Sequence, residues 1–441
     1  MLPLFLLALP QILLKYFHHL WVRIVKLIWV LTGTSAKIES AMSGKEAAAP
    51  AHVQRVVWIN PTSSLAVPES FFTVHERFAP ADIVLDNKVH LLSVTSKTAT
   101  FTEVDSDILD SKKHPFIWSA QVKCCTRLIV LPVQSFYKLV DKIDVEDRKV
   151  VWLFHTTRCR STAWVQAFNS IPGWVAFSAP QALVYSVVHG DHGYNSAESF
   201  SKTEEYRRIL IAIITMYLRQ TPPGWSVLWK AIHLDEHMIY HLVRRFPQHK
   251  LLVAYRDVLP VVSSFQRAFG KFVNLRYRAE QLRYRAPSDV KWWSHMSNLG
   301  TFTNGFNHDF RMKVIARVKP RTVIEWSVFT WCAKLTTIKQ AQESGINIKP
   351  LKYDGLAENK RATVVKLFEY LDISSDYVDL ACEALNYDSQ AAAPNVKWKT
   401  GNTKEQYQWM KDGELVKRCN MILEEFSFPL LGSSFDLANS I

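Results

Sequence analysis

The sequence predicts an α/β protein with a central parallel sheet, preceded by a small β-rich module and an N-terminal amphipathic helix. From residue 149 onward, apolar runs of strand length alternate with longer helical segments, which indicates βαβ units. Between residues 52 and 148, short β-branched and aromatic runs are separated by Pro, Asp, Asn and Ser, which indicates strands. Residues 1–32 are apolar but carry basic residues at helical spacing.

The composition is that of a globular protein, with 48% hydrophobic and 21% charged residues among 441. The formal net charge of +13 favours an anionic partner, such as a phosphate-bearing cosubstrate, an acidic substrate or a membrane surface. Nucleic acid is not expected, because the sequence has no RNP, zinc-finger or helix-turn-helix signature. The six cysteines lack CxxC spacing, so neither a metal site nor a disulfide framework is predicted.

Residues 1–32 are predicted to associate with a membrane surface. The apolar run from Leu2 to Leu14 is shorter than the ~18 to 20 residues that span a bilayer, and Pro10 interrupts it. The following apolar residues are interrupted every three or four positions by Lys15, His18, His19, Arg23 and Lys26. Such a helix suits the interface of an anionic membrane; the alternative is a helix docked on the protein's own core. Basic residues that follow the first apolar run favour the cytosolic face over the Golgi or ER lumen.

The remaining chain divides into three segments. Residues 33–51 consist of small residues and are predicted to be a linker. Residues 52–148 form the β-rich module, which a helix at 135–142 closes. Residues 149–441 form the main α/β domain, in which residues 204–219 are predicted to be helical and residues 226–232 to be a strand.

The stretch from Lys149 to Phe168 predicts a buried strand, a polar turn and a helix. Such turns bind phosphate, because the first helical turn leaves backbone N–H groups unpaired. Arg158, Ser161 and Thr162 add a cation and two hydroxyls to this turn. The turn has no glycine and no GxxxxGK[ST], so an ATP or GTP P-loop is not supported.

A second strand-to-helix connection lies between residues 250 and 269. The strand ends in Arg256, and Asp257 can cap a helix that carries Ser263 and Ser264 in its early turns. Considered alone, this is a surface strand end with a helix cap. It gains weight because it follows the first loop in the chain.

These segments resemble the nucleotide-binding elements of the sulfotransferases. Their 5′-phosphosulfate loop, roughly [KR]-x-G-[ST]-T, is similar to Arg158, Cys159, Arg160, Ser161 and Thr162, with Arg160 at the glycine position. Arg256 and Ser264 match the spacing that grips the 3′-phosphate of 3′-phosphoadenosine 5′-phosphosulfate (PAPS) in that family. The stretch from Tyr353 to Leu356, with the helix after it, resembles the family's YEDL-x(n)-LFxFL packing element.

The resemblance implies a divergent PAPS-dependent sulfotransferase with a P-loop NTPase-like three-layer domain. PAPS would bind at the carboxyl ends of the strands, as ligands do in open α/β sheets. A hydroxyl or amine of the acceptor would attack sulfur in line, without a metal. Lys230 is a candidate second cation and His233 a candidate base, one place beyond the His of the family's Lys-Thr-His. Lys399 is expected in a loop that closes over the nucleotide.

Two alternatives follow from departures in the motifs. Ala179 stands where related proteins carry the glutamate of Ser-Glu-Pro, so no glutamate base is assigned. With Arg160, this favours a catalytically weakened relative that binds a nucleotide or acidic partner at a membrane. The other alternative is a phosphotransferase with a different donor. The basic, aromatic stretch 276–321 fits a substrate-facing lid or a solvated helical face; histidines 155, 189 and 192 are reserve bases, and the acceptor is undetermined.

Overall fold

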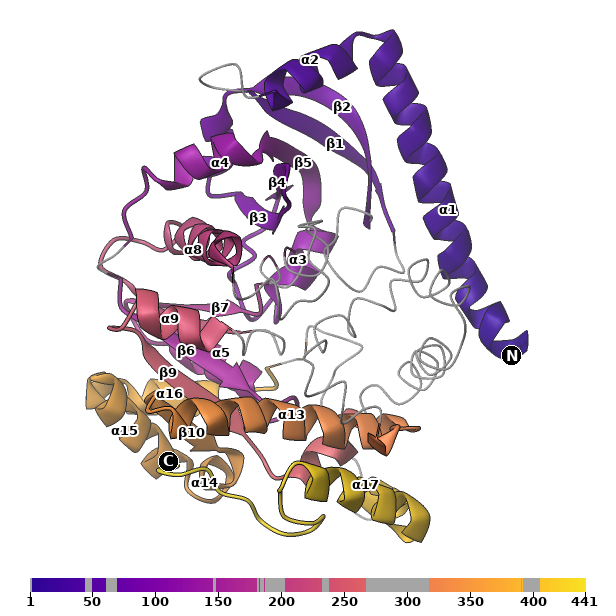
Figure 1. The fold of residues 1–441 in the computed structure, drawn as a ribbon. Coiled ribbons are helices and arrows are strands. Elements are labelled where there is room, and N and C mark those ends of the chain that lie inside the picture. Colours follow the sequence, from indigo (N-terminus) through magenta and orange to yellow (C-terminus); the bar gives the residue numbers. More distant parts are fainter. Residues whose placement is uncertain are drawn as a thin grey trace.

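In the computed structural model, two five-stranded sheets lie one beyond the other, with helix α8 (Glu204–Leu218) between them (Figure 1). The structure describes residues 2–43, 50–60, 70–145, 148–180, 182, 186, 203–231, 238–266, 317–389, 391 and 405–441. One sheet is antiparallel and is formed by the first part of the chain. The other is parallel and is formed by residues 150–352.

The parallel sheet has the order β10-β9-β6-β8-β7, with β6 at its centre. Its strands are β6 (Val150–His155), β7 (Trp174–Ser178), β8 (Ser226–Lys230), β9 (Lys250–Tyr255) and β10 (Ile348–Lys352). Every recorded pairing in this sheet is parallel. The predicted α/β class with a parallel sheet is therefore confirmed.

The connections of this sheet define one topological switch point. From β6 the chain goes to β7, on the β8 side of the sheet, whereas from β9 it goes to β10 on the opposite side. β6 and β9 are direct neighbours, and His155 at the end of β6 pairs with Ala254 of β9. Ligands in open α/β sheets bind outside the carboxyl ends of such a strand pair. The loops after β6 and β9 are therefore the expected position of a site.

Helices cover both faces of the parallel sheet, giving three layers. Alternate residues of β6 enter two separate clusters, Val151 and Leu153 on one face and Trp152 and Phe154 on the other, as the two-residue period of a strand requires. The first face packs against α5 (Ser161–Asn169), α15 (Lys360–Leu371) and α16 (Val378–Ala384). The second packs against α8, α9 (Ile239–Arg245), α13 (Val323–Glu343) and α17 (Gly413–Glu425).

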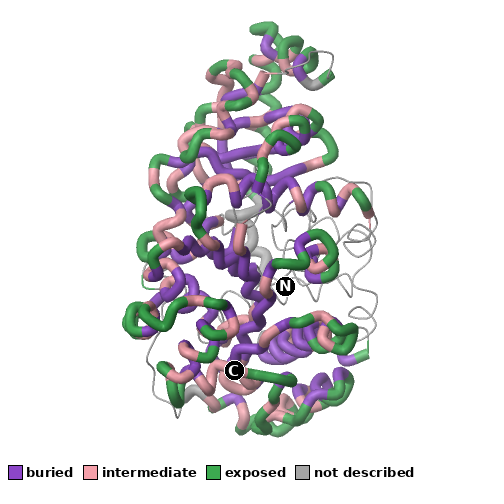
Figure 2. The backbone as a smooth tube through the Cα atoms, turned by 90° about the vertical axis from the view of Figure 1, so that its left-hand side faces the viewer, coloured by how far each residue is buried: buried purple, intermediate pink, exposed green. Residues whose placement is uncertain are grey.

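The antiparallel sheet has the order β2-β1-β5-β4-β3. Its strands are β1 (Ala51–Ile59), β2 (Phe71–Ala79), β3 (Val89–Val94), β4 (Thr98–Val104) and β5 (Cys125–Pro132). The same part of the chain contains the helices η2 (Ala81–Leu85), α3 (Ile117–Lys123) and α4 (Val133–Val140). The hydroxyl of Tyr217 in α8 donates to the Leu91 carbonyl of β3 at 3.1 Å, while its ring packs against Trp229 of β8. One hydrophobic cluster consequently extends through both sheets, which Figure 2 shows as buried segments in purple.

Two expected irregular segments are partly helical. The expected linker 33–51 contains α2 (Thr34–Met42), which begins after Gly33 in a left-handed conformation. Small residues such as alanine are good helix formers, so this composition does not exclude a helix. The expected turn after β10 is the short helix α14 (Tyr353–Glu358). The 3₁₀ elements η6 (Ser375–Tyr377) and η7 (Glu405–Lys411) complete the described fold.

The N-terminal residues form helix α1 (Leu2–Leu31), which lies beside β2 along one edge of the molecule (Figure 1). Its indole Trp21 Nε1 donates to the Thr73 carbonyl of β2 at 3.1 Å. Within the described residues, no helix is long and apolar enough to cross a membrane.

Candidate functional site

Hydrogen bonds hold the start of the loop after β6. The Thr156 N–H donates to the Ala254 carbonyl of β9 at 2.9 Å, which continues the pairing of the two strands beyond β6. The Cys159 thiol donates back to the Thr156 carbonyl at 2.7 Å. Cys159 is 2% exposed, and burial raises the pKa of its thiol, so it remains protonated. Its side chain therefore serves the loop's shape.

Arg160 stands where the phosphosulfate-loop motif has glycine, and its backbone has the conformation that glycine favours. Its φ of 65° and ψ of 16° are left-handed, which costs a non-glycine residue roughly 1–2 kcal/mol. It is the N-cap of α5, and its side chain makes no capping hydrogen bond. Its guanidinium donates to the Leu385 carbonyl at the end of α16, at 3.4 Å. The Arg160 side chain is thus engaged with a neighbouring helix.

Arg158 connects the two predicted nucleotide-binding segments. Its Nε atom donates to the Ser264 hydroxyl at 3.0 Å, across 106 positions of sequence. Ser264 lies in the helical segment 258–266 that follows β9, so the contact crosses the switch point. Arg158 also has a left-handed backbone, with a φ of 61°. The loop places this guanidinium between the carboxyl ends of β6 and β9.

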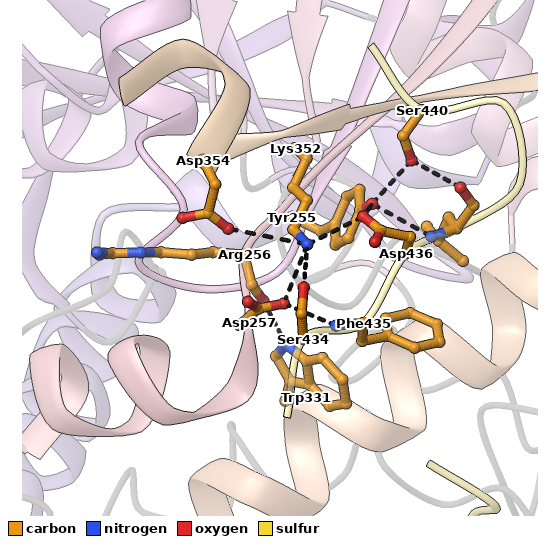
Figure 3. Close-up of polar contacts among 11 residues, drawn as sticks. Tyr255, Arg256, Asp257, Trp331, Lys352, Asp354, Ser434, Phe435, Asp436 and Ser440 are labelled. Carbon is orange, nitrogen blue, oxygen red and sulfur yellow. Dashed lines mark hydrogen bonds and ion pairs between the residues drawn. The ribbon is translucent and has the colours of Figure 1, made fainter. Parts of the chain in front are cut away.

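Arg256 lies directly after β9, beside Lys352 and Trp331 (Figure 3). Its carbonyl accepts a hydrogen bond from Trp331 Nε1 at 2.8 Å, and its guanidinium stacks 4.0 Å from the centre of the Tyr353 ring. Its Nε atom is buried and has no hydrogen-bond partner among the described residues. A buried donor without an acceptor costs free energy unless a ligand satisfies it.

Beside Arg256, Lys352 joins the C-terminal segment to the ends of β9 and β10 (Figure 3). Its ammonium lies 2.9 Å from Asp436, 2.7 Å from the Ser434 hydroxyl and 3.5 Å from Asp257. The Asp257 carboxylate also accepts from the Phe435 N–H at 3.1 Å. The recorded side-chain contacts of Asp257, a predicted helix cap, are therefore with Lys352 and the C-terminal segment.

Two buried lysines lie near the loop after β6. Lys230, at the end of β8, is 3% exposed, and its ammonium lies 4.9 Å from the centre of the Phe116 ring. Burial, with a smaller contribution from the positive charge of Lys334, lowers the pKa of Lys230 to about 8. Lys334 of α13 is 2% exposed and donates to the His155 carbonyl at 3.0 Å. These two buried ammonium groups add positive charge near the loop after β6.

Lys334 was not among the residues predicted from the sequence. It lies on the same side of α13 as the buried residues Trp331 and Ile338, at helical spacing. A single lysine on an otherwise apolar helix face is the signal that indicates such a residue.

The other predicted residues have these positions. Ser161 and Thr162 are buried in the first turn of α5, and the Thr156 hydroxyl before them is buried without a partner among the described residues. The ring of His155, a reserve base, has both nitrogens within hydrogen-bond distance of backbone carbonyls. Ala179 is left-handed, with a φ of 54°, and its N–H donates to the Lys230 carbonyl.

Several predictions lie outside the described residues: His233, Lys399, histidines 189 and 192, the loop 395–402 and most of the basic stretch 276–321. Among the residues that are described, no group of His, Cys, Asp and Glu could hold a metal ion.

No protein-family model matches the chain, and no curated protein matches it. Its structure is similar to that of the sulfotransferase domain of the Synechococcus PCC 7002 olefin synthase, with 13% identity, a TM-score of 0.36 and coverage of 66% of this chain and 98% of that one. It is also similar to a sulfotransferase from Alicyclobacillus acidocaldarius (11%, 0.31, 64% and 97%) and to sulfotransferase STF9 from Mycobacterium avium (12%, 0.34, 67% and 81%). Likeness at this level does not establish an activity for this chain.

Proposed function

We propose that this protein transfers a sulfuryl group from PAPS to a hydroxyl or amine of an acceptor. The observation that carries the proposal is the hydrogen bond between Arg158 and Ser264 at the switch point. The sequence resemblance assigns Arg158 to the 5′-phosphate and Ser264 to the 3′-phosphate of one nucleotide. Their contact supports the assignment of both segments to one site.

The unsatisfied groups of the site fit a ligand with two phosphate groups. Near α5, the uncapped helix N-terminus, the Thr156 hydroxyl and Lys230 offer donors and charge for the 5′-phosphate. Near β9, the Arg256 Nε, which has no partner among the described residues, suits the 3′-phosphate, together with Ser264. Charge-assisted hydrogen bonds from such donors are the strong contacts by which proteins hold phosphate.

In this proposal the bound nucleotide supplies the activated sulfuryl group. Arg158, Ser161 and Thr162 bind its 5′-phosphate and stabilise the charge that develops on the leaving group, because preorganised donors in a buried site act more strongly than water. Lys230 adds a positive charge at the same strand ends. His233 remains the proposed base. Lys399 remains a proposed contact to the nucleotide.

Binding is tested by thermal unfolding with adenosine 3′,5′-bisphosphate, the desulfated nucleotide. A ligand that binds only the native state stabilises it by ~2.7 kcal/mol at a concentration of 100 Kd, so a rise in Tm is expected. A Tm that does not move at millimolar nucleotide rejects the nucleotide site, and with it the sulfotransferase proposal.

Transfer is tested with labelled PAPS and a mixture of small acceptors. Arg158→Ala and Arg256→Ala are expected to abolish label transfer and nucleotide stabilisation. The matched control is Arg244→Ala, which removes an exposed arginine at the end of α9 and is expected to change neither. If Arg158→Ala and Arg256→Ala transfer label at the rate of the control, the assignment of the two arginines is wrong.

A second candidate is a nucleotide-binding relative without transferase activity. The observation that favours it is Ala179, which provides no carboxylate where the resemblance implies one. Nucleotide stabilisation without label transfer to any acceptor would favour this candidate over the enzyme.

A further inference from the structure

Among the described residues, one face of helix α1 makes its buried contacts with the protein. His18 and Val25 are buried, with His18 Nε2 3.1 Å from the Phe71 carbonyl, and Trp29 packs edge-on against His52. With Trp21, these residues recur at helical spacing along one line. They hold α1 against the edge of the antiparallel sheet.

A second face of α1 is apolar and exposed. Its exposed residues recur every three or four positions, which places them on one stripe. They are Leu13, Phe17, Leu20, Ile24, Leu27, Ile28 and Leu31, and each is at least 46% exposed. The stripe continues towards β1, because Phe17 and Trp58 both contact the ring of Phe72. An exposed apolar surface of this length on a helix marks an interaction site.

Between these two faces, α1 carries exposed basic residues. His19, Arg23 and Lys26 are exposed and recur at helical spacing, on a line between the docked face and the apolar stripe. Residues 2–31 contain no aspartate or glutamate. The apolar stripe is therefore bordered by positive charge, with no negative charge in the same helix.

We propose that α1 lies in the plane of an anionic lipid surface, with the apolar stripe inserted between headgroups and the basic residues against phosphates. A helix with one apolar and one basic face binds such a surface both by burying apolar area and by electrostatic attraction to anionic lipids. A second copy of α1 fits the stripe less well, because pairing would bring basic residues together without acidic partners. The docked face orients the body of the protein on the membrane, which a free amphipathic helix would not do.

The proposal is tested by cosedimentation of the full chain with phosphatidylcholine vesicles, with and without phosphatidylserine. The protein is expected to bind the anionic vesicles and to bind the neutral ones weakly. Combined Leu20→Gln, Ile24→Gln and Leu27→Gln is expected to lower the partition coefficient at least about tenfold. The matched control replaces three exposed apolar residues elsewhere, Leu380, Met421 and Leu430, by glutamine and is expected to bind normally.

The charge contribution has its own matched pair. Arg23→Gln with Lys26→Gln is expected to lower binding to anionic vesicles about 30-fold, because each basic residue near such a surface contributes about fivefold. Lys411→Gln with Lys417→Gln makes the same change in net charge at exposed positions near α17 and is expected to have little effect.

Unchanged binding of the Leu20, Ile24 and Leu27 variant would overturn the proposal. A wild-type dimer that the same substitutions convert to a monomer, without vesicle binding, would show that a second copy covers the stripe.

Discussion

Replacing Lys230 by methionine should stabilise the free protein while it removes nucleotide binding. Burial lowers the pKa of Lys230 from 10.5 to about 8. At 1.36 kcal/mol per pKa unit, keeping the ammonium charged in the folded state below pH 8 costs about 3 kcal/mol. Methionine has similar length and no charge, and it loses the interaction with the Phe116 ring, worth ~1 kcal/mol. The net gain is about 2 kcal/mol.

The pH dependence gives this prediction a second measurement. The folded-state pKa of Lys230 lies below the unfolded-state value, so between pH 8 and pH 10.5 the unfolded chain binds more protons. The unfolding free energy of the wild type should therefore gain a rising contribution across that range. The Lys230→Met variant should lack this contribution.

The assay is thermal unfolding at pH 7 and at pH 10, with and without adenosine 3′,5′-bisphosphate. With an unfolding entropy of ~2.1 cal/mol/K per residue, a gain of 2 kcal/mol raises Tm by about 2 °C at pH 7. Lys339→Met, at an exposed position of α13, is the control and should leave Tm nearly unchanged. A Lys230→Met variant that is less stable than wild type at pH 7 and still responds to nucleotide would refute the reasoning.

Three further substitutions test other contacts. Arg160→Gly should raise the unfolding free energy by about 1 kcal/mol relative to Arg160→Ala in urea denaturation, because glycine adopts the left-handed conformation without strain. Glu325→Gln should lower it by about 3–5 kcal/mol in the same measurement, since Glu325 is fully buried and Arg418 would lose its partner. Ser264→Ala should weaken nucleotide binding about tenfold in calorimetry and lower Tm by about 2 °C, because Arg158 loses the acceptor that orients it.

The local features of the site could be predicted from the sequence because short stretches determine them. The strand of β6, the polar turn and α5 follow from an apolar run, a group of polar residues and helical spacing. The approach of Arg158 to Ser264 depends on β6 and β9 being neighbours, which the sequence did not predict; the resemblance implied only that both segments contact one nucleotide. Their hydrogen bond is consistent with that expectation.

The remaining contacts of the site depend on tertiary packing and could not be predicted. Lys334 contacts the end of β6 from α13, 179 positions away, and no local pattern specifies which strand a helix covers. Lys352 directly precedes the predicted packing element, and its partners Ser434 and Asp436 come from the C-terminal segment, which no local pattern specifies. The helix α2 formed in an expected linker because a composition of small residues is compatible with either state.

The free protein is destabilised at several points that surround one region. Arg158 and Arg160 have left-handed backbones, Lys230 is a buried cation, and Thr156 Oγ1 and Arg256 Nε are buried donors without described partners. Each feature costs on the order of 1–3 kcal/mol, and each substitution that would remove the cost is chemically simple. A bound polyanion would satisfy both donors and neutralise the cation, so its binding reverses most of these costs together. The groups that such a ligand would satisfy lie at the carboxyl ends of neighbouring strands, where open α/β sheets bind their ligands, and this favours a ligand over independent packing defects.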